Sequence, residues 1–278
     1  MLSFPGARSG REKARGLSYD RQGRILAALS AAGSVTVAAL ASELAVSDMT
    51  IRRDLIELER EGRLKRVHGG AVALGSLPPV TMDREEPSFD ARLRHRRLAK
   101  EAIAAAAVQI VAQHRTIALD VGTTTFLMAD GLRDLPHAKI FTNSIRVATA
   151  LDGASGEVYL AGGRVRRDEL STGGPAATAQ FEALWFDVAV IGVSGITSEG
   201  LFDYSLDDTE MKRVYLKRAG LRVAVCDSAK FQRMSLVAIA ALSDINILVT
   251  DEPPPDRLSA ALAAANVEVR VARPVQAA

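Results

Sequence analysis

The strongest constraint on the fold of this chain is an alternation that begins near residue 116. Six short apolar runs occur there with helical patterns between them: TIALD, KIFT, VYLAGG, VAVIGVSG, RVAVCDS and INILVTD. Continuous apolar strands that alternate with helices are typical of a parallel sheet with both faces covered. The sequence therefore predicts an α/β fold with a doubly wound parallel sheet, which binds its ligands at the carboxyl ends of the strands.

The end of the first of these strands predicts an anion site. Asp120 ends the strand, and Gly122 leads into a helix through three threonines, which are Thr123, Thr124 and Thr125. Backbone N–H groups at a helix start, together with threonine hydroxyls, suit a phosphate dianion. The run is neither GxGxxG nor GxxxxGK[ST], so it does not indicate a dinucleotide or ATP. A glycine–threonine helix cap without a ligand is the alternative interpretation.

Later strand ends supply more candidates for binding an effector, namely Asn143, Gly162, Gly163, Ser194, Gly195, Asp227, Ser228 and Lys230. Lys230 is the first choice for a cation that pairs with phosphate, and a surface lysine that caps the preceding turn is the alternative. Lys212 is a weaker candidate, because charged faces of helices such as DDTEMKRVYLKRAG are usually solvated. Together these groups suit a small phosphorylated sugar or polyol.

A further helix is predicted before the first strand, over the stretch RLRHRRLAKEAIAAAAVQIVAQ. Its apolar stripe contains Leu98, Ile103, Ala106 and Ile110. The preceding residues 75–92 are rich in proline and charge and show little periodicity, which indicates a linker. The longest apolar run, residues 102–112, is too short to span a bilayer, which needs roughly 18 to 20 apolar residues.

The N-terminal part has a different pattern, which predicts three helices and a hairpin. A first helix ends near Gly33, a second begins at the N-cap Thr36, and a third begins at the N-cap Ser47 after a tight turn. This is the helix–turn–helix arrangement, in which the second helix of the pair enters the major groove of DNA. The stretch GRLKRVHGGAVAL then predicts a strand, a glycine turn and a strand, which form a wing beside the duplex.

The third helix divides into two faces at about 100° per residue. Ile51, Leu55 and Leu58 form the buried face, and the opposite side offers arginine, threonine and methionine side chains. A solvated face with ion pairs to Asp54 and Glu57 is the alternative for the two arginines, but it does not account for the preceding helices and the basic hairpin. The residues expected to contact DNA are Thr36, Ser47, Met49, Thr50, Arg52, Arg53, Lys65, Arg66 and His68.

Two segments resemble a known family. VTVAALASELAVSDMTIRRDLIELEREGRLKRVHGGA, from Val35 to Ala71, is similar to the winged helix–turn–helix of DeoR-type bacterial transcription regulators. From about Glu86 to Pro255 the chain resembles the effector domain of that family, and the resemblance implies a fold similar to ribose-phosphate isomerase. GVSGI…GLFDY, CDSAKFQR and TDEPPP look most like the glycerol-3-phosphate repressor branch.

The resulting hypothesis divides the chain into a disordered basic arm (1–17), a winged helix–turn–helix domain (18–74), a linker (75–92) and an effector domain (93–278). Residues 1–74 carry 12 Lys and Arg against 8 Asp and Glu, whereas the remainder carries 23 against 25. We expect a repressor of a sugar or polyol catabolic operon, released from double-stranded operator DNA by a phosphorylated sugar or polyol. The alternative is a sugar-phosphate isomerase-like enzyme with an N-terminal nucleic-acid tether.

The remaining expectations concern partners and location. Two-fold operator sites favour a homo-oligomer, either a dimer or a tetramer. We expect no enzymatic activity, no cofactor and no metal. Cys226 is the single cysteine, which excludes a CxxC metal or redox pair. The basic start of the chain shows no apolar signal-peptide region, so a cytoplasmic protein without membrane contact is expected.

Overall fold

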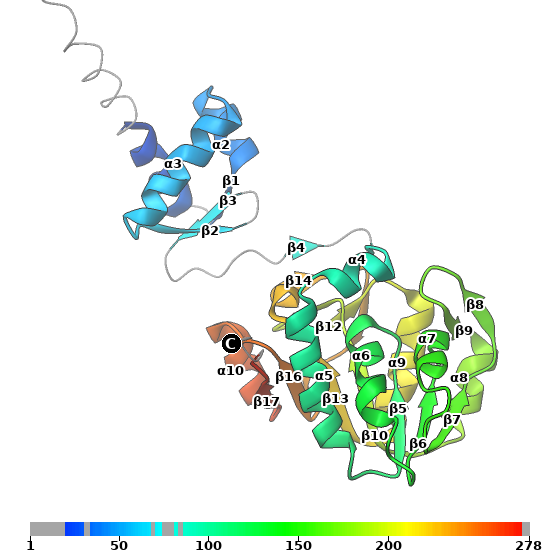
Figure 1. Cartoon of the computed structure of the whole chain (residues 1–278). Coiled ribbons are helices and arrows are strands. Elements are labelled where there is room, and N and C mark those ends of the chain that lie inside the picture. Colours follow the sequence, from blue (N-terminus) through cyan, green and yellow to red (C-terminus); the bar gives the residue numbers. More distant parts are fainter. Residues whose placement is uncertain (1–19, 31–33, 68–69, 74–80, 83–85, 274–278) are drawn as a thin grey trace, which may run out of the picture. The chain divides into compact units, whose positions relative to one another are not determined.

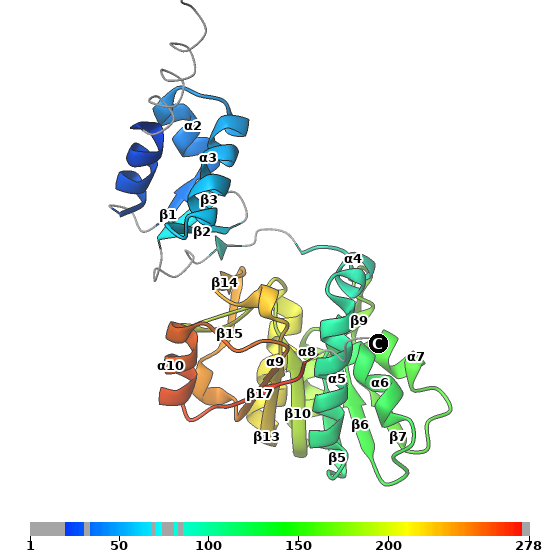
Figure 2. The same cartoon turned by 60° about the vertical axis from the view of Figure 1, so that its left-hand side comes forward.

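The computed structural model describes residues 20–30, 34–67, 70–73, 81–82 and 86–273. The chain divides into two compact units, Met1–Pro79 and Val80–Ala278, which Figures 1 and 2 show in two views. The expected arm of residues 1–17 lies outside the described residues, as does part of the expected linker of residues 75–92. Where that linker was expected to continue to residue 92, the chain is already helical from Phe89.

The N-terminal unit combines helices with a small antiparallel sheet in the strand order β1-β3-β2. Residues 20–30 are helical. The elements that follow are β1 (Ser34–Thr36), α2 (Val37–Leu44), α3 (Asp48–Arg60), β2 (Leu64–Val67) and β3 (Gly70–Ala73). One core holds Ile25 and Leu29 from the first helix together with Ile51, Leu55 and Leu58 from α3. The predicted three helices and hairpin are confirmed.

Local signals in the sequence set the ends of these elements. The Thr36 hydroxyl accepts a hydrogen bond from the Ala39 N–H at the start of α2, and the Ser47 hydroxyl accepts one from the Thr50 N–H at the start of α3. Gly70 is required by a close approach of two strands, because a Cβ there would lie 2.0 Å from the carbonyl oxygen of Val35.

The second unit is built on a seven-stranded sheet with the strand order β17-β16-β13-β10-β5-β6-β7, in which every neighbouring pair is parallel. In chain order the strands are β5 (Thr116–Leu119), β6 (Lys139–Thr142), β7 (Glu157–Leu160), β10 (Phe186–Gly192), β13 (Ala219–Val225), β16 (Ile247–Thr250) and β17 (Glu268–Val271). The predicted parallel sheet is confirmed. Its edge strand β17 was not among the six predicted runs.

Helices cover both faces of this sheet, as Figures 1 and 2 show. The helices are α4 (Phe89–Arg94), α5 (Arg97–Val111), α6 (Thr123–Leu132), α7 (Ile145–Ala150), α8 (Pro175–Glu182), α9 (Leu206–Arg218) and α10 (Asp256–Ala264). Strand alternation separates two cores: Val188 and Val190 of β10 join the core under α5 and α6, and Ala189 and Ile191 join the core under α8 and α9. The doubly wound architecture is therefore confirmed.

Shorter strands lie outside the seven-stranded sheet. β8 (Arg164–Arg166) and β9 (Ser171–Gly173) form a hairpin. β11 (Gly195–Thr197), β12 (Gly200–Asp203) and β15 (Val237–Ala240) form a small antiparallel sheet, and β14 (Arg233–Met234) pairs with β4 (Thr81–Met82). Two short 3-10 turns, Ser228–Lys230 and Leu242–Asp244, complete the elements of this unit. None of these short strands was predicted.

The helix predicted over residues 92–113 is two helices. Arg96 adopts a left-handed conformation (φ 52°) between α4 and α5. The prediction that Leu98 belongs to the buried apolar stripe is wrong, because its side chain is 69% exposed. Lys100, two residues later, is buried. The reason is the helix break, because the Lys100 ammonium donates hydrogen bonds to the carbonyl oxygens of Arg92 and His95 that the break leaves free.

None of the described helices is both long enough and apolar enough to cross a membrane.

Candidate functional site

The outer face of α3 is cationic. Arg52 and Arg53 are exposed, and neither has an ion-pair partner within the described part of the chain. The nearest carboxylates are engaged elsewhere: Asp54 is buried and accepts two hydrogen bonds from Arg21, at 2.5 and 3.0 Å, and Glu57 accepts one from Gln22. The alternative in which Asp54 and Glu57 neutralise the two arginines is therefore wrong.

The other residues expected to contact DNA surround this face. Met49 is 74% exposed, and Thr50 shares a hydrogen bond of 2.9 Å with Ser47. Lys65 and Arg66 are exposed on β2, and the Arg66 guanidinium lies 3.8 Å from Glu59. Thr36 and Ser47 serve as the N-caps described above. His68 lies outside the described residues.

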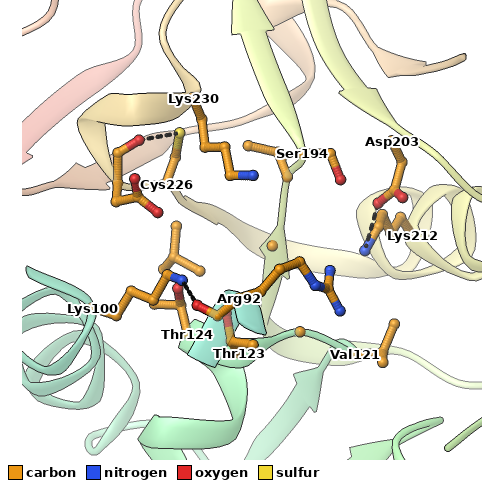
Figure 3. A pocket seen from close by; sticks show the side chains of 15 residues that line it. Arg92, Lys100, Val121, Thr123, Thr124, Ser194, Asp203, Lys212, Cys226 and Lys230 are labelled. Atoms are coloured by element: carbon orange, nitrogen blue, oxygen red, sulfur yellow. Dashed lines mark hydrogen bonds and ion pairs between the residues drawn. The ribbon is translucent and has the colours of Figure 1, made fainter. Parts of the chain in front are cut away.

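A pocket opens at the carboxyl ends of the central strands of the second unit, and Figure 3 shows it from close by. Its lining combines cations, carboxylates, hydroxyls and glycines. The lining residues are Arg92, Lys100, Val121, Gly122, Thr123, Thr124, Gly192, Val193, Ser194, Asp203, Lys212, Val225, Cys226, Asp227 and Lys230. Seven of the fourteen residues expected to bind an effector lie in this lining.

One wall of the pocket is the N-terminus of α6. Gly122 is its N-cap, with a φ of 154° that favours glycine, and the side chains of Thr123 and Thr124 are buried beside it. The first N–H groups of a helix have no partner inside the helix, so they are available to an anion. Thr125 does not line the pocket, because its hydroxyl donates to the Gly122 carbonyl oxygen at 3.1 Å.

A buried ion pair supports this wall. The Lys212 ammonium on α9 binds Asp120 and lies 3.2 Å from Asp203 on β12. Burial raises the pKa of the Asp120 carboxyl to about 7, although Lys212 works against this rise. Burial alone would lower the pKa of Lys212, but the Asp120 and Asp203 carboxylates outweigh it and raise that pKa. Lys212 therefore stays charged inside the pocket.

Two further lysines face the pocket near the α6 terminus, and both appear in Figure 3. The Lys230 ammonium forms no salt bridge or hydrogen bond with the residues that the structure describes. Lys100 is bound only to neutral carbonyl groups, and burial lowers the pKa of its ammonium to about 8, a shift that Asp227 opposes. These two cations have no carboxylate bound to them, so they can accept an anion without breaking an ion pair.

Seven of the expected effector residues lie outside the lining: Asp120, Thr125, Asn143, Gly162, Gly163, Gly195 and Ser228. Asp120 is fully buried behind the pocket, where it pairs with Lys212. Asn143 is buried, accepts a hydrogen bond from Tyr215 and donates one to the Thr172 carbonyl. The Ser228 N–H and hydroxyl both bind Asp251. These contacts hold the strand-end loops in place.

Arg92, Lys100 and Asp203 line the pocket but were missed in the sequence. The signal for Lys100 was a lysine on the buried side of an otherwise apolar helix, and Asp203 stood in the quoted fragment GLFDY. Arg92 had no local signal, because it lay in the expected linker. Within the described ranges, no cluster of three or more His, Cys, Asp or Glu side chains is placed to hold a metal.

Comparisons with known proteins cover both units. Residues 21–76 match the DeoR-like helix-turn-helix domain, and residues 96–252 match the DeoR C terminal sensor domain. The chain is 35% identical over 239 residues to the HTH-type transcriptional regulator GlpR of Haloferax volcanii, covering 84% of this chain and 90% of that protein. It is 33% identical over 235 residues to the regulator GolR of Listeria innocua, with the same coverage of 84% and 90%.

The glycerol-3-phosphate regulon repressor of Escherichia coli is 29% identical over 238 residues, which cover 85% of this chain and 92% of the repressor. Among solved structures, ribose 5-phosphate isomerase A from Neisseria gonorrhoeae matches with 15% identity and a TM-score of 0.35, covering 48% of this chain and 52% of that one. The chain belongs to the DeoR family and is a transcriptional repressor with a DNA-binding helix-turn-helix and a C-terminal sensor domain, not an enzyme.

Proposed function

We propose that this repressor controls a sugar or polyol catabolic operon and that a phosphorylated sugar or polyol, bound in the pocket of the second unit, releases it from its operator. The observation that best supports this proposal is that the two ends of the pocket offer different chemical groups. Lys100, Lys230 and the α6 N-terminus offer charge and N–H donors to a phosphate. Asp203, Ser194 and Lys212 offer acceptors and donors to sugar hydroxyls.

The operator side of the proposal rests on the outer face of α3 and on the hairpin. Arg52 and Arg53 are free of ion pairs among the described residues, so their guanidinium groups can bind base edges or phosphates without losing a partner. Lys65 and Arg66 on β2 supply backbone contacts. We place the protein in the cytoplasm with its DNA, as a dimer or tetramer that matches a two-fold operator.

Release follows from thermodynamic linkage. An effector that binds better to a conformation with low operator affinity must weaken operator binding by the same coupling free energy. The proposal is tested by a thermal-shift screen of the full chain against phosphorylated sugars and polyols, with the unphosphorylated compounds as matched controls. A ligand of the folded state raises the melting temperature. A panel in which no phosphorylated compound raises it more than its unphosphorylated partner contradicts the proposal.

A further inference from the structure

Arg92 joins the pocket to the segment that leads toward the N-terminal unit. Its guanidinium lies among the lining side chains in Figure 3. One terminal nitrogen donates to Glu86 at 2.7 Å, and the other binds Glu169. The remaining nitrogen, Nε, is buried and has no hydrogen-bond partner among the described residues. Arg92 is therefore a pocket cation that two carboxylates already hold.

Glu86 is held from two sides. Its second oxygen binds Arg166 of β8, and the same arginine binds Asp208 on α9. The side chain of Glu86 is only 13% exposed, so this cluster is shielded from water and its charges interact strongly. Glu86 stands three residues before α4, and α4 carries Arg92. The Arg92–Glu86 pair thus fixes Glu86 and the start of α4 onto the wall of the pocket.

Packing also joins α4 to α6, the helix whose N-terminus lines the pocket. Phe89, the first residue of α4, is buried and meets Phe126 of α6 edge-to-face, with ring centroids 5.6 Å apart. The N-terminus of that same α6 is the phosphate-binding wall of the proposed function. Because Arg92 of α4 lines the same pocket, a ligand at this wall lies beside the helix that the Arg92–Glu86 pair holds.

A dianion near Arg92 changes the balance of charge in this cluster. It attracts the guanidinium, whose Nε is free to donate, and it repels the carboxylates of Glu86 and Glu169. We propose that an anionic effector in the pocket competes with Glu86 for the guanidinium of Arg92 and so loosens the attachment of residues 86–94. This inference rests on the proposed function, because it needs an anion in the pocket.

The first test measures binding of inorganic phosphate to the full chain by calorimetry, at fixed pH and ionic strength, for the parent and for Glu86→Gln. Removing the competing charge should lower the Kd for phosphate by about fivefold or more. Glu101→Gln is the matched control, because Glu101 pairs with Arg97 on the exposed side of α5 away from the pocket, and its Kd should equal that of the parent. A Kd for Glu86→Gln equal to or weaker than that of the parent overturns the inference.

The second test needs no variant. Hydrogen exchange of the backbone amides in residues 86–94 of the parent should become faster when phosphate saturates the pocket, and unchanged or slower exchange overturns the inference. The outcomes separate the two proposals. If phosphate does not bind to the parent at all, both fail. If it binds equally well to parent and Glu86→Gln, only the competition for Arg92 fails.

Discussion

Asp120 and Lys212 form a buried ion pair beside the pocket, which Lys212 lines, although they stand 92 positions apart in the sequence. Asp120 is the residue that follows β5, and Lys212 projects from α9, which packs against the opposite face of the sheet from α6. Their carboxylate and ammonium groups are 0% and 2% exposed. The pair therefore ties the end of a central strand to a covering helix.

Lys212→Met should destabilise the second unit by about 3 to 5 kcal/mol, because it leaves the carboxylates of Asp120 and Asp203 buried without their cation. Urea unfolding followed by circular dichroism measures this loss. Lys217→Met is the matched control, since Lys217 is exposed on the same helix, and it should change the free energy of unfolding by less than about 0.5 kcal/mol. Equal stabilities of the two variants would refute a structural role for the pair.

The fold could be predicted because its signals are local. The apolar runs at residues 116–120 and 247–251, the Gly122 turn and the caps Thr36 and Ser47 each act over a few residues. The burial of Lys212 could not be predicted from the sequence, because a charged side chain on a helix gives no sign of the carboxylate 92 positions away that pairs with it. The same holds for Lys100 and Leu98, whose places depend on a helix break at Arg96.

The pocket lysine Lys100 predicts a pH dependence. Its pKa is lowered by burial to about 8, so the ammonium is charged below that pH and neutral above it. Sulfate stays a dianion throughout this range, and its affinity should fall as the pH rises through 8, by at most about tenfold per unit. Calorimetric titrations between pH 7 and 9.5 measure the profile. Lys100→Met should bind sulfate weakly with a flat profile, and a parent profile without a fall above pH 8 contradicts this role.

Arg53→Ala should weaken specific operator binding by about 1 to 3 kcal/mol if the guanidinium contacts a base edge. The operator can be selected from random DNA with the parent protein, and binding is then compared with that of a scrambled duplex at fixed salt. The control is Arg97→Ala, which removes the same charge from an exposed position on α5. An Arg53→Ala variant with parental affinity for both duplexes removes Arg53 from the interface.

Lys65→Ala should chiefly reduce the salt dependence of DNA binding. A lysine that neutralises one phosphate contributes about one unit to the slope of log K against log salt, through counterion release. The neighbouring Arg66 is a weaker test, because its guanidinium lies 3.8 Å from Glu59 and is partly neutralised. Fluorescence anisotropy with a labelled duplex at several salt concentrations gives the slope. An unchanged slope places Lys65 away from the DNA backbone.

Lys230→Ala separates sensing from DNA binding, because Lys230 lies in the second unit and the DNA-binding helix in the first. Among the described residues the Lys230 ammonium has no salt bridge or hydrogen bond, so its removal leaves no buried carboxylate unpaired and should leave the fold intact. Substitution of Asp120 would instead break a buried ion pair. Operator affinity without effector should equal that of the parent. The effector concentration needed for release should rise at least about tenfold, since a charge-assisted contact to phosphate is lost.

Operator binding across a titration with the compound from the thermal-shift screen measures both quantities, with Lys217→Ala as the control. A parental response to effector would show that Lys230 does not bind its phosphate.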